Sequence, residues 1–93
     1  MIQSFRNRKT LRFFNGEQIA QFHPFRNQAR RRLAVLDNAT SLRDLAALRS
    51  NRLEALSGDR RGQHSIRIYR QWRICFRWAD DGAYDVEIVD YHD

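Results

Sequence analysis

The chain has 93 residues, of which 42% are hydrophobic and 12% aromatic, enough for one hydrophobic core and too few for two. That composition excludes a disordered chain, so we expect a single domain over residues 1–93. The only cysteine, Cys75, excludes an internal disulfide, and residues 1–14 lack the apolar run of a secretory signal or a membrane span. We therefore expect a cytoplasmic protein that does not associate with membranes.

Positive charge is concentrated in the first part of the chain. The net charge is +6; residues 1–36 carry eight Lys or Arg against Glu17, whereas residues 37–93 carry nine against ten carboxylates. Lys9 is the only lysine, and arginine suits bidentate recognition of phosphate or carboxylate. This indicates a polyanionic partner, either nucleic acid or an acidic protein surface, although a GC-rich genome explains the arginine bias equally well.

The N-terminal half is expected to be mainly helical. Residues 2–5 alternate as in an edge strand, and residues 7–14 predict a short helix that ends at Asn15-Gly16. Pro24 suits the first position of a second helix of about thirteen residues. Its apolar stripe would pack against a sheet and consists of Phe25, Ala29, Leu33 and Leu36. Ser41 and Asp44 resemble a capping pair for one or two further helical turns.

The C-terminal half changes to the period-two pattern of strands. We expect strands at residues 52–56, 64–69, 72–78 and 84–90, with tight turns joining the last three. In the third strand, alternation separates a core face (Trp72, Ile74, Phe76 and Trp78) from a polar face (Arg73, Cys75 and Arg77). The predicted fold class is therefore α+β, with N-terminal helices packed on an antiparallel β-sheet.

Arginines share the polar parity of neighbouring strands. Arg67, Arg73 and Arg77 form either a phosphate site or an ordinary solvated sheet face. Arg73 stands out because Trp72 and Ile74 anchor its backbone in the core. That anchoring would hold its guanidinium in place to stabilise developing charge.

Other candidate groups for chemistry lie at the C-terminus and on the outer strands. In Asp90-Tyr91-His92, the histidine can act as a general acid or base, and the tyrosine can stack on a base or donate a proton; an ordinary C-terminal tail is the alternative. Glu54 and Glu87 could act as bases, although solvated surface carboxylates are commoner. The three histidines and Cys75 lack paired ligand spacing, so we expect no metal.

Five segments together resemble the HigB group of the RelE/ParE toxin superfamily, in the family's order: MIQSF (1–5), RLEALSGD (52–59), GQHSIR (62–67), QWRICF (71–76) and VDYH (89–92). The resemblance implies a small RelE-like α+β toxin that enters the ribosomal A site and cleaves messenger RNA during translation. It also implies a HigA-like helix-turn-helix antitoxin as partner, and no small-molecule cofactor.

The resemblance also implies roles for individual residues. Such cleavage is a transesterification in which the ribose 2′-OH attacks the adjacent phosphate. Arg73 would bind the phosphate and stabilise the transition state, His92 would supply acid–base chemistry, Tyr91 would stack on a base and help proton transfer, and Asp90 would position its neighbours. The candidates for RNA binding are Arg60, Arg61, Arg67 and Arg77.

The chain departs from the family at one segment. Relatives often read LHPLKGD where this chain has residues 53–59, so Glu54 replaces a histidine and Ser57 a lysine. Glu54 could serve as a base, but Ser57 cannot replace a cation near the phosphate. Loss of one charge-assisted phosphate contact costs about 1.5 to 3 kcal/mol, or roughly ten- to a hundredfold in binding or rate. We therefore expect a weak nuclease, with Arg60 and His64 as candidates to compensate.

Two other functions stay open on the sequence. A ParE-like poison of DNA gyrase would leave DNA breaks with intact transcripts. A catalytically weak module that binds RNA or the antitoxin would leave messenger RNA uncut.

Overall fold

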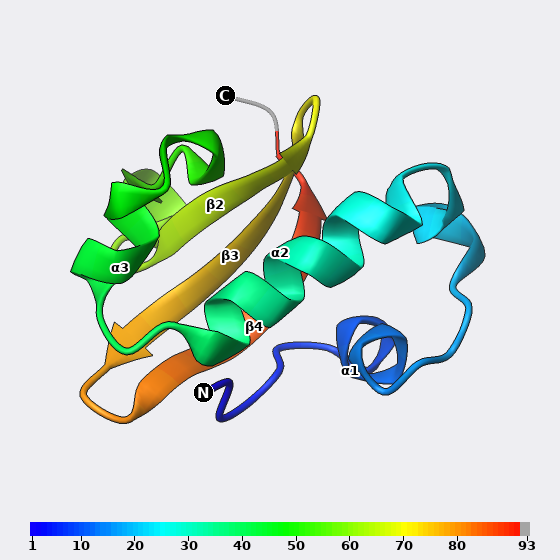
Figure 1. The fold of residues 1–93 in the computed structure, drawn as a ribbon, viewed down its shortest axis with the longest axis horizontal. Coiled ribbons are helices and arrows are strands. Elements are labelled where there is room, and N and C mark those ends of the chain that lie inside the picture. Colours follow the sequence, from blue (N-terminus) through cyan, green and yellow to red (C-terminus); the bar gives the residue numbers. More distant parts are fainter. Residues whose placement is uncertain (92–93) are drawn as a thin grey trace.

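A four-stranded antiparallel sheet forms the centre of the fold (Figure 1), as seen in a computed structural model that describes residues 1–91. The strands lie in chain order, β1 (Glu54–Ala55), β2 (His64–Tyr69), β3 (Trp72–Ala79) and β4 (Gly82–Asp90), and each pairs antiparallel with the next. Together with the N-terminal helices this confirms the predicted α+β class.

The first helices form largely as their sequences predict. α1 (Arg8–Phe14) is preceded by its N-cap residue, Asn7, whose side chain accepts a hydrogen bond from the Thr10 N–H. α2 (Arg26–Asn38) buries Ala29, Leu33 and Leu36 of the predicted stripe, and Phe25, the first residue of that stripe, is buried just before the helix begins. Pro24, however, does not open α2 as expected; it lies in the preceding 3-10 helix η1 (Ala20–Phe25), and α2 starts two residues later. Inside η1 the proline leaves out one i to i−3 hydrogen bond, which a short 3-10 helix tolerates, and the sequence did not distinguish this place from the start of α2.

The connection between α2 and the sheet contains one feature that was not predicted. α3 (Leu42–Ala47) has the expected cap, in which Ser41 accepts from the Asp44 N–H. It is followed by a 3-10 helix, η2 (Arg49–Asn51), whose fully buried Asn51 donates to the Leu45 carbonyl. The predicted strand at 52–56 is reduced to β1 because Arg52 takes a left-handed backbone with φ 46°. No helix within residues 1–91 is long and apolar enough to cross a membrane.

The N-terminal segment lies beside β4 without forming a continuous strand. Two isolated parallel bridges join Ile2 to Ala83 and Phe5 to Val86. The approach requires glycine at position 82, because φ there is 134° and a Cβ would collide with the Met1 carbonyl. The expected edge strand at 2–5 is therefore present only as these two contacts.

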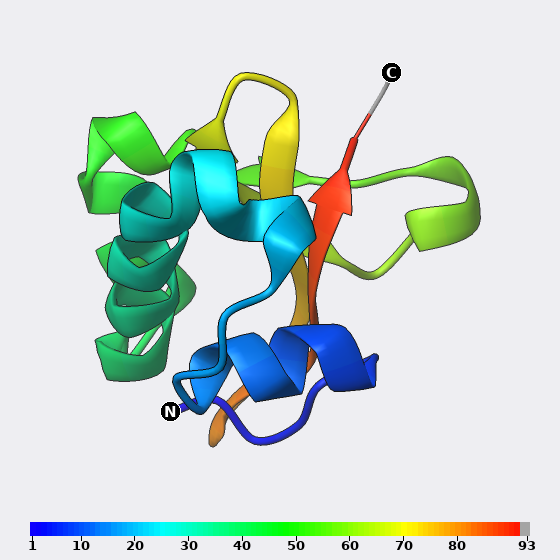
Figure 2. The ribbon, with the colours of Figure 1, turned by 90° about the vertical axis from the view of Figure 1, so that its right-hand side faces the viewer.

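The two faces of the sheet differ in what covers them. α1 and α2 pack on the face that carries the buried apolar residues of the strands, namely Ile66, Ile68, Ile74, Phe76, Val86 and Ile88. Figure 2 shows the short 3-10 helix η3 (Gly58–Arg60) on the side of the sheet away from α2. We call that side the open face; by strand register it carries Glu54, Ser65, Arg67, Arg73, Cys75, Glu87 and Val89.

Candidate functional site

Arg73 is buried at the centre of the open face, with only 9% of its surface exposed. Its Nε donates a hydrogen bond to Ser65 Oγ at 2.6 Å, and its Nη2 donates to the Arg52 carbonyl oxygen at 2.6 Å. Two short bonds from one planar group fix the plane of the guanidinium. The alternative of an ordinary solvated face is therefore wrong for Arg73. Among the described residues, no hydrogen bond uses Nη1.

Glu54 lies next to this guanidinium. Its Oε2 is 3.8 Å from Arg73 Nη2, and 56% of its side chain is exposed. The position follows from the pairing of β1 with β2, which sets Glu54 opposite Ser65. An exposed carboxylate beside a fixed guanidinium can accept a proton while the arginine stabilises negative charge.

The other two arginines of the predicted row differ in their distance from Arg73 along the sheet. Arg67 is the direct cross-strand partner of Arg73, and its Nε donates to the Arg70 carbonyl at the β2–β3 turn. Arg77 lies beyond a bulge in the β3–β4 pairing and is tied to Asp85 at 2.9 Å. The bulge residue Asp85 has φ 54°, a conformation that period-two alternation does not reveal. The open face thus brings together Arg67 and Arg73, but not Arg77.

A second ion-pair group surrounds Glu87. Only 16% of the Glu87 side chain is exposed, and its Oε1 accepts from Arg60 Nη1 at 3.1 Å and lies 3.6 Å from Arg6 Nε. Arg60 also donates to Gln63 Oε1 at 3.1 Å. The interpretation of Glu87 as a solvated carboxylate is therefore wrong. Arg6 was not singled out from sequence, because only the tertiary structure brings residue 6 to β4.

Cys75 lies under these charged groups and is completely buried. Burial raises the pKa of its thiol to about 11; Glu87 adds to the rise, whereas Arg60 and Arg73 oppose it. The thiol is therefore neutral and unreactive near pH 7.

The other candidates near Glu54 do not extend this site. His64 lies on the helix-covered face, where its ring stacks on Phe76 with centroids 6.2 Å apart, so the hypothesis that it compensates for Ser57 on the open face is wrong. Arg61 follows η3 and is exposed. Within residues 1–91, no group of three or more His, Cys, Asp or Glu side chains is arranged to hold a metal.

The C-terminal triplet begins at the end of β4, beside the β2–β3 turn (Figure 1). Asp90 is the cross-strand partner of Trp72, and the Tyr91 N–H donates to the Gln71 carbonyl at 3.0 Å. Strand alternation from Val89 assigns Tyr91 to the open face and Asp90 to the opposite one. His92 lies outside the described residues.

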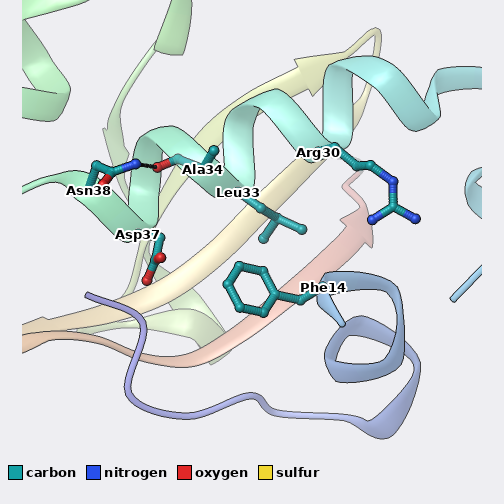
Figure 3. Close-up of a pocket in the computed structure, with 6 residues that line it drawn as sticks. All are labelled: Phe14, Arg30, Leu33, Ala34, Asp37 and Asn38. Carbon is teal, nitrogen blue, oxygen red and sulfur yellow. Dashed lines mark hydrogen bonds between the residues drawn. The ribbon is translucent and has the colours of Figure 1, made fainter. Parts of the chain in front are cut away.

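A groove also lies on the other side of the molecule, between α1 and α2 (Figure 3). It has a volume of about 300 Å³, and Phe14 and Leu33 face each other across it. Arg30 closes one end by donating to the carbonyls of Phe13 at 2.7 Å and Glu17 at 3.2 Å. Arg30 thus joins the two helices, so part of the N-terminal positive charge is structural and does not form an anion site.

The sequence as a whole is similar to those of known bacterial toxins. A family model described as the HigB-like toxin, a RelE-like toxin of type II toxin–antitoxin system HigB, matches residues 3–92. The chain is similar to Toxin HigB-1 of Vibrio cholerae, with 32% identity over 85 residues that cover 89% of this chain and 90% of that protein. It is also similar to Endoribonuclease HigB of Proteus vulgaris, with 38% identity over 61 residues that cover 66% of this chain and 65% of that protein.

Proposed function

We propose, because the chain belongs to the HigB-like toxin family of type II toxin–antitoxin systems, that it is an endoribonuclease that cleaves messenger RNA on the ribosome and so stops translation. The name of the Proteus vulgaris relative, an endoribonuclease, supports this activity. The observation that carries the proposal is the pairing of the fixed Arg73 guanidinium with the exposed Glu54 carboxylate on the face of the sheet opposite α1 and α2.

The proposed reaction is a transesterification within the RNA. Glu54 takes the proton of the ribose 2′-OH as the 2′-oxygen bonds to phosphorus. Arg73 Nη1 binds a non-bridging phosphate oxygen, where negative charge develops. The P–O5′ bond breaks, and His92 gives a proton to the leaving oxygen. The products are a 2′,3′-cyclic phosphate and a 5′-OH end. Asp90 positions its neighbours, and no metal or cofactor is required.

RNA would lie along the open face from the β2–β3 turn towards η3. Tyr91 stacks on a base near Arg67, while Arg60 and Arg61 contact phosphates at the η3 end. Arg77 is a further proposed phosphate contact; its side chain is exposed and paired with Asp85. With Ser57 in place of a cation, the enzyme is expected to be slow.

The family implies an antitoxin partner, since its members are toxins of type II systems. We assign this role to a HigA-like helix-turn-helix protein, and the toxin to the cytoplasm, where ribosomes and messenger RNA are found.

Expression of the chain without its antitoxin, followed by mapping of messenger RNA 5′ ends, tests the proposal. We expect new ends inside translated frames, absent with Arg73→Ala and retained with Arg43→Ala, which removes one exposed arginine of α3. DNA breaks with intact transcripts would instead favour a gyrase poison. Growth arrest with neither lesion would favour a module that only binds, which the loss of a cation at Ser57 makes the second candidate.

A further inference from the structure

We propose that Ser65 and the left-handed turn at Arg52 act together as a positioning device for Arg73. Ser65 is completely buried on the central strand β2, and its hydroxyl oxygen accepts from Arg73 Nε. Arg52 supplies its carbonyl oxygen to Nη2 of the same guanidinium. The inference rests on the proposed function, because it names the residues that orient the phosphate-binding group of that reaction.

Ser65 is a polar residue where the sheet would accept an apolar one. Its cross-strand partner on the same face, Cys75, is likewise completely buried, so Ser65 has little contact with solvent. A buried polar group is retained without loss of stability only when it is hydrogen-bonded. Its partner here is the Nε of Arg73, and Ser65 Oγ is the only acceptor for that Nε within residues 1–91. Removal of the hydroxyl would therefore leave the Nε–H without this hydrogen bond.

Arg52 supports the same guanidinium through its backbone. A non-glycine residue with φ 46° is unfavourable, and such conformations persist where the surrounding structure fixes them. At Arg52 this conformation ends η2 and turns the carbonyl to within 2.6 Å of Arg73 Nη2. The exposed side chain of Arg52 plays no part in this contact.

Together the two acceptors fix the position of the guanidinium beside Glu54. At 3.8 Å the carboxylate is close to Nη2 but outside the 2.7–2.9 Å range of a charge-assisted hydrogen bond. Ser65 and Arg52 accept from Nε and Nη2, and no hydrogen bond among the described residues uses Nη1. Nη1 therefore stays available to bind phosphate, and the Glu54 carboxylate stays available to accept a proton.

The test is a mutant cycle measured as single-turnover cleavage of messenger RNA on programmed ribosomes. Ser65→Ala should lower the rate about tenfold, whereas Ser65→Thr, which keeps the hydroxyl, should stay within about twofold of wild type. In an Arg73→Lys background, which has no guanidinium Nε to donate to Ser65, Ser65→Ala should not lower the cleavage rate further. An equal loss in both backgrounds would show that Ser65 is merely structural and would overturn the proposal.

A matched pair at Arg52 tests the backbone contact without touching the core. Both Arg52→Asn and Arg52→Val remove the same exposed charge, but asparagine tolerates the left-handed conformation and valine does not. We expect Val to be at least fivefold slower than Asn, and equal rates would contradict the role of the turn. If Arg73→Ala itself cleaved at the wild-type rate, the proposed function would fail; if only Arg73→Ala lost activity, the positioning device alone would fail.

Discussion

Glu54 Oε2 lies 3.8 Å from Arg73 Nη2, so that an exposed carboxylate and a buried guanidinium face the same space at the edge of the sheet. If Glu54 is the base, Glu54→Gln should lower the cleavage rate about a hundredfold. Thermal unfolding should change little, because exposed ion pairs contribute about 0.2 to 1 kcal/mol. A Gln variant that cleaves at the wild-type rate would exclude Glu54 as the base.

Arg60 and Arg61 are adjacent in sequence but differ in their surroundings. Arg60 is held by Glu87 and Gln63, whereas Arg61 is exposed. Arg60→Ala should weaken binding to the programmed ribosome about tenfold, because a fixed guanidinium binds phosphate without first being ordered. Arg61→Ala removes the same charge and should cost no more than about threefold. Equal losses would show that only overall charge matters on this side of the open face.

Tyr91 is predicted to act by stacking. Its backbone N–H donates to the Gln71 carbonyl at the β2–β3 turn, and strand alternation from Val89 assigns its ring to the open face. Tyr91→Phe keeps the ring and should cleave within about threefold of wild type, whereas Tyr91→Ala should lose roughly ten- to a hundredfold, corresponding to about 1 to 3 kcal/mol of stacking. If Phe were as slow as Ala, the phenolic proton, and not the ring, would be the active feature.

The buried Cys75 thiol should make the fold less stable as the pH rises above 9. Burial raises the pKa of the thiol from 9.0 to about 11 in the folded chain, so the stabilisation is fully present below pH 9 and is lost as the pH rises towards 11. The free energy of unfolding should fall by about 2 kcal/mol by roughly pH 10.5. Urea unfolding of wild type and Cys75→Ala across this range checks the effect. The variant should lack this component, and parallel pH curves would contradict it.

The sheet was predictable because alternation leaves a direct record in sequence. The parity of Trp72, Ile74 and Phe76 was assigned correctly, as were the short β2–β3 and β3–β4 connections. The same rule could not show that Arg73 is buried, because parity gives the face of a residue but not what covers it. At Arg73 the covering groups come from Ser65 and from the η2–β1 turn.

Left-handed residues caused the main departures from the sequence-based expectation. Neither Arg52 nor Asp85 is a glycine or part of an Asn-Gly pair, so their left-handed backbone could not be read from the sequence. Arg52 shortens β1, and Asp85 lies at the shift in β3–β4 register between Cys75 and Arg77. Such conformations are imposed by contacts made elsewhere in the fold, and local propensity does not record them.

By itself, the sequence determined the α+β class, the stripe of α2, the core parity of the strands, the Glu54 and Ser57 departures and the resemblance to HigB toxins, since each depends on local periodicity or on residue identity. Only the tertiary structure decided that Arg73 is fixed beside Glu54, that Glu87 joins Arg60 to Arg6, and that His64 faces the helices. Those relationships join segments far apart in the chain, and the direction of a long side chain depends on which acceptors the folded backbone places within its reach.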